Sequence, residues 1–231
     1  MKKELVVALG LALGLASGLA CTPLRMGAPA DLAQESEVTQ VTDRSRMTGA
    51  FANESFKMGP YEVTKVDRKW NSSSGSSVAI FDSKEAKTGY SFTFKSSHGE
   101  AKVQCGSKSK ENNTSVLGFD ITTSQDDIGC VCEGPGASSK IQLSSGNGDT
   151  YQGPVVARSG AMTVTAVTSF SNGSKSSTPI GYEFRAQNVV AAVELAHPGQ
   201  MWMSKSLDEQ TRADLACLSA GLLLYLPPKK D

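Results

Sequence analysis

The sequence has 231 residues, with 23 Lys and Arg against 23 Asp and Glu, 39% apolar side chains, 22 Gly, 5 Cys and 2 His. This length suffices for one sizeable domain, and the apolar share together with the glycines excludes wholesale disorder and a collagen-like repeat. The balanced charge argues against a nucleic-acid-binding surface, because phosphate backbones require a broad positive field.

The N-terminus has the pattern of an export signal. A short basic start is followed by an apolar stretch over residues 5–20 that ends in small residues just before Cys21. The segment Leu19-Ala20-Cys21 resembles the end of a bacterial lipobox, although Gly18 stands where Leu is usual. We therefore expect residues 1–20 to be a lipoprotein signal peptide and Cys21 to receive the lipid. The alternative is ordinary signal peptidase cleavage, which leaves Cys21 as a free or disulfide-bonded thiol.

Lipidation would place the protein in the bacterial cell envelope. More than one acyl chain makes membrane attachment effectively permanent. Residue 22 is Thr and not the Asp that retains some lipoproteins in the inner membrane, which favours the outer membrane. Residues 21–57 are polar and lack an apolar period, so they are predicted to form the lipidated Cys and a flexible linker. A linker of about 36 residues would span roughly 30 to 35 Å.

Residues 58–231 are predicted to form a β-rich domain. Short segments of alternating or β-branched character recur about every eight to twelve residues and are separated by clusters of Gly, Asn, Ser and Asp. We expect about twelve strands. They lie at residues 61–67, 77–81, 90–95, 101–105, 115–121, 129–132, 140–143, 153–157, 162–169, 180–185, 189–195 and 201–203. Asn147-Gly148 is a predicted tight turn.

The last segment has the features of a helix. Ser206 and Glu209 fit a capping box, which predicts a helix that begins at Ser206. Residues 213–226 are apolar on nearly every side, and Pro227-Pro228 would end the helix. A helix that is apolar all round must be enclosed, and about 14 residues are too few for a bilayer span of about 20. We expect burial within the protein, with insertion into a membrane or a partner as the alternative.

Two groups of motifs recur in the same order. VTKV at residues 63–66 recurs as VTAV at 164–167, and GYSF at 89–92 recurs as GYEF at 181–184. A Ser/Gly-rich loop separates the two motifs in both copies, and each GYxF motif is followed by a strand, AKVQC or AAVEL. The pattern predicts two related halves. Chance similarity among Val/Thr-rich strands is the alternative.

Two related β-halves that end in one very apolar helix resemble the tubby-like barrel of tubby C-terminal domains, plant LURP-one-related proteins and phospholipid scramblases. The resemblance covers about residues 58–226 and implies a closed antiparallel barrel of about twelve strands with the C-terminal helix through it. It also implies phosphoinositide binding or a role in lipid movement. No basic phosphoinositide-binding motif matches this sequence, so the resemblance assigns no binding residue. The alternative fold is a β-sandwich with the helix packed across one end.

With Cys21 assigned to lipid, four cysteines remain in an exported protein, where oxidising conditions permit disulfides. Cys130 and Cys132 lie two apart on a predicted strand, so both face the same side and do not easily bond to each other. We favour a bond from Cys105 to Cys130 or to Cys132. Cys217 is either a buried small hydrophobic residue or the partner of the remaining strand cysteine. The spacing of Cys130 and Cys132 is not CxxC, so neither a redox-active nor a zinc site is expected.

The sequence predicts no catalytic or metal site and no cofactor. His98 and His197 lie in predicted turns, away from any recognisable nucleophile motif. Asp120, Asp126 and Asp127 are interpreted as solvated acidic turn residues, because their spacing does not match an EF-hand loop.

Two further groups of residues have a simple structural interpretation. A small basic cluster is interpreted as a solvated face, because Glu100 and Glu111 dilute it; contact with anionic lipid headgroups is the alternative. The cluster comprises Lys95, Lys102, Lys108 and Lys110. The large aromatic residues Trp70, Trp202 and Tyr182 are expected in the core or at sheet edges rather than at an interface.

We therefore expect a non-enzymatic, lipid-anchored envelope protein whose barrel is a binding or scaffolding module. Its expected partners are the membrane, through the N-terminal lipid, and a protein of the envelope, with no nucleic acid. A lipid-binding or lipid-handling protein is the alternative. An enzyme has the weakest support, because two histidines and scattered acids form no coherent set of acid, base and nucleophile.

Overall fold

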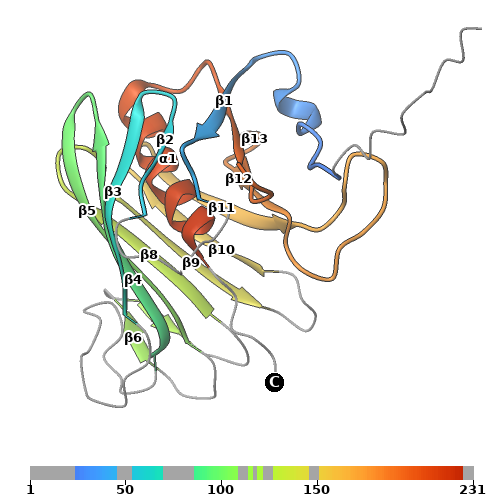
Figure 1. Ribbon diagram of the computed structural model, residues 1–231. Coiled ribbons are helices and arrows are strands. Elements are labelled where there is room, and N and C mark those ends of the chain that lie inside the picture. Colours follow the sequence, from blue (N-terminus) through green and yellow to red (C-terminus); the bar gives the residue numbers. More distant parts are fainter. Residues whose placement is uncertain are drawn as a thin grey trace, which may run out of the picture.

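The chain folds into a closed antiparallel β-barrel of twelve strands around one helix, α1 (Figure 1). The computed structural model describes residues 24–45, 54–69, 86–108, 114–116, 119–121, 127–145 and 151–225. The predicted fold class is confirmed, and the alternative β-sandwich is wrong. None of the helices within the described ranges is long and apolar enough to cross a membrane.

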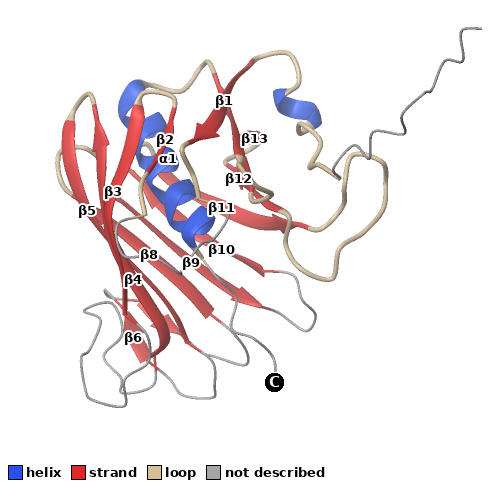
Figure 2. Ribbon diagram, in the orientation of Figure 1, coloured by secondary structure: helices blue, strands red, loops and turns tan. Residues whose placement is uncertain are grey.

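The barrel strands are neighbours in chain order, so each pairs with the strand before and after it (Figure 2). They are β1 (Ser36–Thr42), β2 (Phe56–Met58), β3 (Tyr61–Lys69), β4 (Ala86–Ser96), β5 (Gly99–Lys108), β8 (Asp127–Glu133), β9 (Ser139–Ser145), β10 (Tyr151–Ala157), β11 (Gly160–Val167), β12 (Gly181–Arg185), β13 (Val189–Glu194) and β14 (Gln200–Ser204). The barrel closes where β1 pairs with β14, with Val38 opposite Trp202. Closure leaves the barrel itself without an unpaired sheet edge.

Two strands lie outside the barrel. β6 (Thr114–Val116) and β7 (Phe119–Ile121) form a separate two-stranded sheet in the connection between β5 and β8. The single strand predicted over residues 115–121 is therefore wrong. The strand predicted over residues 77–81 and the turn at 147–148 lie outside the described residues.

The barrel begins earlier in the chain than predicted. β1 and the first two residues of β2 fall within residues 21–57, which were expected to be a flexible linker, and this expectation is wrong for these residues. In β1 the side chains of Thr39 and Val41 are buried while their neighbours are exposed. In β2 Phe56 and Met58 are buried on either side of an exposed lysine. Since only two side chains of each strand face inward, the apolar period is too short to stand out in the sequence.

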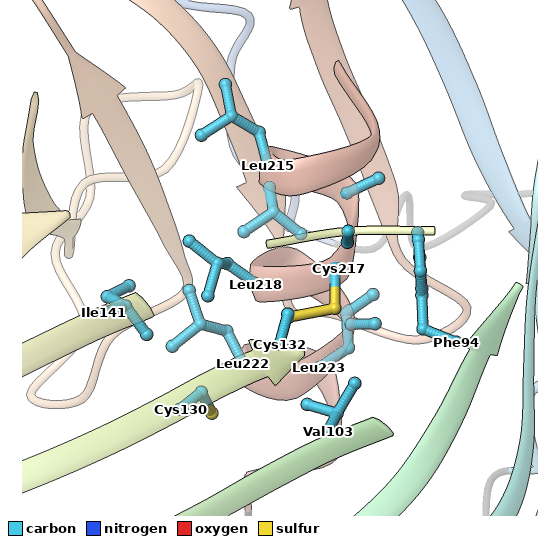
Figure 3. Packing of buried hydrophobic residues seen from close by; sticks show 14 of the residues in the cluster. Phe94, Val103, Cys130, Cys132, Ile141, Leu215, Cys217, Leu218, Leu222 and Leu223 are labelled. Atoms are coloured by element: carbon cyan, nitrogen blue, oxygen red, sulfur yellow. A yellow bond between two sulfur atoms is a disulfide. The ribbon is translucent and has the colours of Figure 1, made fainter. Parts of the chain in front are cut away.

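The helix α1 (Glu209–Leu224) lies inside the barrel, as its apolar sequence predicts (Figure 1). Every side chain from Ala213 to Leu224 is buried. The buried residues of the strands and of α1 form one hydrophobic cluster. Figure 3 shows Leu218 and Leu222 of α1 directed toward Ile141 of β9, with Phe94 of β4 on the opposite side of the helix.

The helix begins at a different cap from the one predicted. Asp208 is the N-cap, and its carboxylate accepts hydrogen bonds from the backbone N–H of Thr211 at 2.9 Å and from the Thr211 hydroxyl at 2.7 Å. The hydroxyl of Ser206 instead lies 2.8 Å from the hydroxyl of Ser204 in the turn after β14. The capping box at Ser206 is therefore wrong by two residues.

The repeated motifs occupy equivalent places in the barrel. VTKV lies in β3 and VTAV in β11, and GYSF lies in β4 and GYEF in β12, so each motif recurs six strands further around a barrel of twelve. The pairing differs in register, because Val164 pairs with Phe184 whereas Val63 pairs with Phe94 and not with Phe92. The pairing of β3 with β4 is also irregular between Thr64 and Asp67, where Lys65 has a φ of 53°.

A second, smaller core lies on the outer face of β12 to β14. Met26 and Leu32, the latter in a 3₁₀ turn at Ala30–Leu32, pack there with Ala192 and Trp202. These strands are thus covered by α1 on the inside and by the N-terminal segment on the outside, which explains why Met201, Trp202 and Met203 of β14 are all buried in succession. The buried position predicted for Trp202 is confirmed.

Candidate functional site

Two disulfides lie in the barrel interior. Cys105 of β5 bonds to Cys130, its direct partner on β8, and Cys132 of β8 bonds to Cys217 of α1. All four side chains are buried, and Cys130 and Cys132 face the same side of their strand. The second bond therefore joins the helix covalently to the barrel wall (Figure 3).

A glycine allows α1 to approach the other disulfide. A Cβ atom at Gly221 would lie 2.7 Å from Sγ of Cys130 and 2.9 Å from Sγ of Cys105, so no larger residue fits without movement. The carbonyl oxygen of Gly221 accepts a hydrogen bond of 2.6 Å from the hydroxyl of Tyr90. Burial raises the pKa of Tyr90, which keeps this hydroxyl protonated as a donor. Gly221 follows Cys217 by one helical turn, so both disulfides meet the same face of α1.

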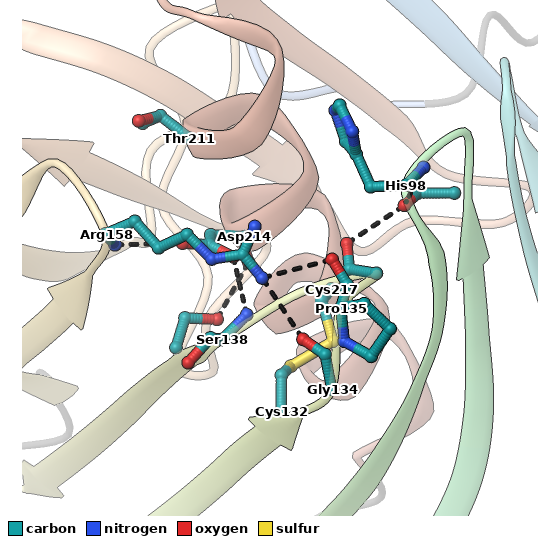
Figure 4. A network of polar contacts seen from close by, with 12 residues as sticks. His98, Cys132, Gly134, Pro135, Ser138, Arg158, Thr211, Asp214 and Cys217 are labelled. Atoms are coloured by element: carbon teal, nitrogen blue, oxygen red, sulfur yellow. Dashed lines mark hydrogen bonds and ion pairs between the residues drawn. A yellow bond between two sulfur atoms is a disulfide. The ribbon is translucent and has the colours of Figure 1, made fainter.

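A buried carboxylate holds the N-terminal half of α1 (Figure 4). Asp214, whose side chain is fully buried, accepts hydrogen bonds from the backbone N–H groups of Ser138 at 2.7 Å and Arg158 at 2.9 Å. Nε of Arg158 lies 3.9 Å from the Asp214 carboxylate, and the hydroxyl of Ser139 donates to the Asp214 carbonyl oxygen at 3.2 Å. The carboxylate thus bridges the helix to the turns that follow β8 and β10, a structural use of charge.

Two arginines hold the opposite end of α1. Arg44 donates to the carbonyl oxygen of Leu223 at 2.6 Å, and Arg68 donates to that of Leu224 at 2.8 Å. Arg68 is also ion-paired with Glu54 at 2.9 Å. Burial lowers the pKa of Arg44 despite the opposing effect of Glu54. Positive charge at this end complements the negative end of the helix dipole.

The outer surface of β8 to β10 carries a hollow of about 400 Å³. The hollow lies next to the Asp214 contacts, since Arg158, Ser138 and Ser139 line the hollow and also contact Asp214. Its other lining residues are Val131, Cys132, Glu133, Lys140, Val156 and Ala157. Charges of both signs and two hydroxyls can hydrogen-bond a polar partner, but this lining contains no nucleophile paired with a base.

The two histidines are not brought together. His98, in the turn between β4 and β5, lies 3.7 Å from the carboxylate of Glu209 at the start of α1. His197, in the connection after β13, lies 2.8 Å from the carbonyl oxygen of Arg44 near the end of α1. The described residues contain no group of three or more His, Cys, Asp or Glu side chains that could hold a metal ion.

The acidic and basic candidates from the sequence lie in different settings. Asp127 is buried at the start of β8, so its interpretation as a solvated turn residue is wrong; it lies on the opposite face of the strand from Cys130 and Cys132. Asp120 lies in β7, and Asp126 lies outside the described residues. Lys95 is ion-paired with Glu62 at 3.4 Å, in keeping with a solvated, mixed-charge face.

Five residues that position the helix were not predicted from the sequence, namely the polar residues Asp214, Arg158, Arg44 and Arg68, and Gly221. One local signal existed, since Asp214 is a lone carboxylate within an otherwise apolar helix and must find partners when buried. No local signal identified its partners, which lie 76 and 56 residues away in the chain.

Comparison with protein-family models, curated proteins and solved structures gives no match for this chain.

Proposed function

We propose that this protein is a lipid-anchored protein of the bacterial cell envelope, in the outer membrane, whose barrel is a non-enzymatic binding or scaffolding module. One observation carries the proposal, namely that the protein's own helix lies in the barrel interior with every side chain from Ala213 to Leu224 buried. An interior filled in this way directs recognition to the outer surface, and the hollow beside Arg158 is a candidate contact region.

The disulfides support export. Cys105–Cys130 and Cys132–Cys217 require an oxidising compartment to form and persist, and such a compartment is what the predicted signal peptide leads to. Cys21 is the one cysteine outside these two disulfides, and it is the residue predicted to carry the lipid.

The use of buried charge supports a structural rather than a catalytic design. Asp214, Arg44 and Arg68 bind backbone groups or oppositely charged side chains and thereby fix the helix. Glu194 binds the N-terminal segment in the same way. Membership of the tubby-like group is part of this proposal, on the support of a helix-filled barrel of twelve strands.

The test is an intact-mass and native mass measurement of the full chain, expressed with its own N-terminus in a Gram-negative host and purified in mild detergent. We expect the mass to start at Cys21, to carry an added diacylglycerol and acyl group, and to lack two hydrogens for each of the two disulfides. The Cys21→Ser variant is the control and should carry no lipid. A mass without lipid at Cys21 would contradict the anchoring, whereas a reproducible non-covalent phospholipid adduct would favour the lipid-handling alternative.

A further inference from the structure

The first described residues of the chain are held firmly on the barrel. Arg25 forms an ion pair of 3.0 Å with Glu194, and the backbone N–H of Met26 donates to the same carboxylate at 2.9 Å. Glu194 is only 1% exposed, so this contact forms at a buried site. The backbone N–H of Ser171 donates to the carbonyl oxygen of Arg25 at 2.9 Å. The chain is therefore fixed to the barrel from Arg25 onward.

The contacts continue along the segment. The Met26 side chain packs so closely on β12 that no Cβ could be accommodated at Gly181. Asp31 accepts a hydrogen bond of 3.0 Å from the backbone N–H of Val189, and Leu32 is buried in the outer core. Polar and apolar contacts together make residues 25–32 part of the folded body.

This attachment shortens the distance from the predicted lipid to the barrel. Only Thr22 and Pro23 separate Cys21 from Leu24, so three steps of about 3.8 Å limit the separation of their Cα atoms to about 11 Å. A free linker over residues 21–57 would instead have allowed roughly 30 to 35 Å. A lipid on Cys21 therefore brings Leu24 close to the level of the headgroups.

We propose that the barrel lies directly against the phospholipid bilayer, with Leu24 and the loop between β11 and β12 facing the headgroups. This inference rests on the proposed lipidation of Cys21. Leu24 is one of two large apolar side chains that are exposed among the described residues, and it is 50% exposed. A half-exposed leucine beside the anchor is suited to the boundary between headgroups and acyl chains.

The loop lies beside the point at which the described chain begins (Figure 1). Its Ser171 binds Arg25, and residues 171–175 are all exposed. The loop is held in shape by backbone hydrogen bonds from Phe170 to Ser174 at 2.8 Å and from Gly173 to Phe170 at 2.9 Å. Its polar side chains and Lys175 can hydrogen-bond phosphate and glycerol groups without entering the hydrocarbon region.

The opposite end of the barrel then faces away from the membrane. The turn at residues 186–188, at the other end of β12, and the Asp214 contacts lie there. A protein partner in the envelope would thus meet the end at which α1 begins, including the hollow beside Arg158.

The test compares labels at the two ends of β12 in the full, lipidated chain. Ser174→Cys and Gln187→Cys both alter exposed residues, and each is labelled with an environment-insensitive fluorophore and reconstituted into phosphatidylcholine/phosphatidylglycerol vesicles that contain headgroup-nitroxide lipid. We expect at least about threefold stronger quenching at residue 174, because five strand residues at about 3.3 Å each separate the two turns by about 16 Å. Wild-type protein treated with the same reagent corrects for labelling at native cysteines.

Flotation with the vesicles tests the lipid anchor separately from the orientation of the barrel. If neither variant floats with the vesicles, the proposed lipid anchor is wrong, and the proposed orientation, which depends on it, is wrong too. If both float and are quenched equally, the anchoring stands and the orientation is overturned. A Gly/Ser insertion of about 24 residues between Pro23 and Leu24, with a span of about 27 Å, should abolish the difference in quenching. A difference that persists after the insertion would overturn the role of the short N-terminal connection.

Discussion

At the end of the barrel where α1 begins, carboxylates accept hydrogen bonds from backbone N–H groups, whereas at the end where α1 finishes, arginines donate to carbonyl oxygens. Asp208 caps the first turn and Asp214 binds the turns after β8 and β10. Arg44 and Arg68 bind the last carbonyls of the helix. Asp208 in front of the first turn and the two arginines at the last turn each match the sign of the helix dipole at their end, whereas Asp214 lies further along the helix and joins it to the barrel.

The difference shows that the two ends of the helix are satisfied in different ways. A helix leaves N–H groups unpaired at its start and carbonyl groups unpaired at its end. At the exposed start of α1 the partner is the helix's own cap, Asp208, whereas at the end the partners are Arg44 and Arg68 from the barrel. The first half of the helix has an additional constraint, because Asp214 lies one turn before Cys217, which is bonded to β8. We therefore expect the first half to contribute more to stability than the arginine-bound end.

Loss of the helix-to-barrel disulfide should have the largest effect. The bond Cys132–Cys217 closes a loop with a sequence separation of 85, and Cys105–Cys130 closes one of 25. The chain-entropy estimate gives about 4 to 5 kcal/mol for the longer loop and about 3.5 kcal/mol for the shorter one. We expect the Cys132→Ala/Cys217→Ala protein to lose more free energy of unfolding in urea than the Cys105→Ala/Cys130→Ala protein, and the reverse order would contradict this account.

Removal of the buried carboxylate should come next. Asp214→Ala leaves the backbone N–H groups of Ser138 and Arg158 without their partner, and we expect a loss of about 3 kcal/mol. Arg68→Met combined with Glu54→Gln, at the other end of α1, should cost less, about 2 kcal/mol, since no unpaired charge is then left buried. Urea unfolding under oxidising conditions measures both. Equal losses of free energy of unfolding, or a larger loss for the Arg68 variant, would contradict the expected difference between the two ends of the helix.

The contact of Gly221 with the disulfide predicts a smaller and conditional effect. Gly221→Ala places a methyl group against Sγ of Cys130 and Cys105, so overpacking should cost about 1 to 3 kcal/mol even though Ala favours a helix. In the Cys105→Ala/Cys130→Ala background the sulfur atoms are gone, and the same substitution should cost little. A double-mutant cycle with urea unfolding measures this coupling. Additive losses would show that the disulfide does not limit the approach of the helix.

Local sequence was sufficient where a feature depends on neighbours in the chain. The apolar residues after Ala213 predict an enclosed helix because every face of that helix is apolar, and the motifs at residues 63–66 and 164–167 predict a repeat without any knowledge of pairing. The barrel's first strand, Ser36–Thr42, was missed because its buried side chains are one polar and one apolar residue, Thr39 and Val41, while the apolar Val38 is exposed.

Other features depend on contacts that the local sequence does not contain. Ser206 and Asp208 are both competent N-caps, and the choice depends on the turn after β14, where Ser206 meets Ser204. The partners of Asp214 are backbone groups of turns far away in the chain, so residue type alone could not identify them. The same holds for Arg44, whose role depends on the closed barrel that brings it to the end of α1.

The cap at Asp208 predicts the smallest effect, a dependence of stability on pH. Hydrogen bonds from the Thr211 side chain and backbone lower the pKa of Asp208 below its ordinary value. A group whose pKa is lower in the folded state stabilises the protein above its unfolded pKa, which is about 3.9 for Asp, and this contribution is lost as the pH falls through the folded pKa. We expect Asp208→Asn to retain a cap but to lose this acid-dependent contribution, so that the wild-type advantage narrows below about pH 4. Because Asp208 is exposed, the change should be under about 1 kcal/mol. Urea unfolding of both proteins between pH 7 and pH 2.5 measures this change. If the difference in free energy of unfolding between the two proteins stays constant with pH, the cap acts through hydrogen bonding alone.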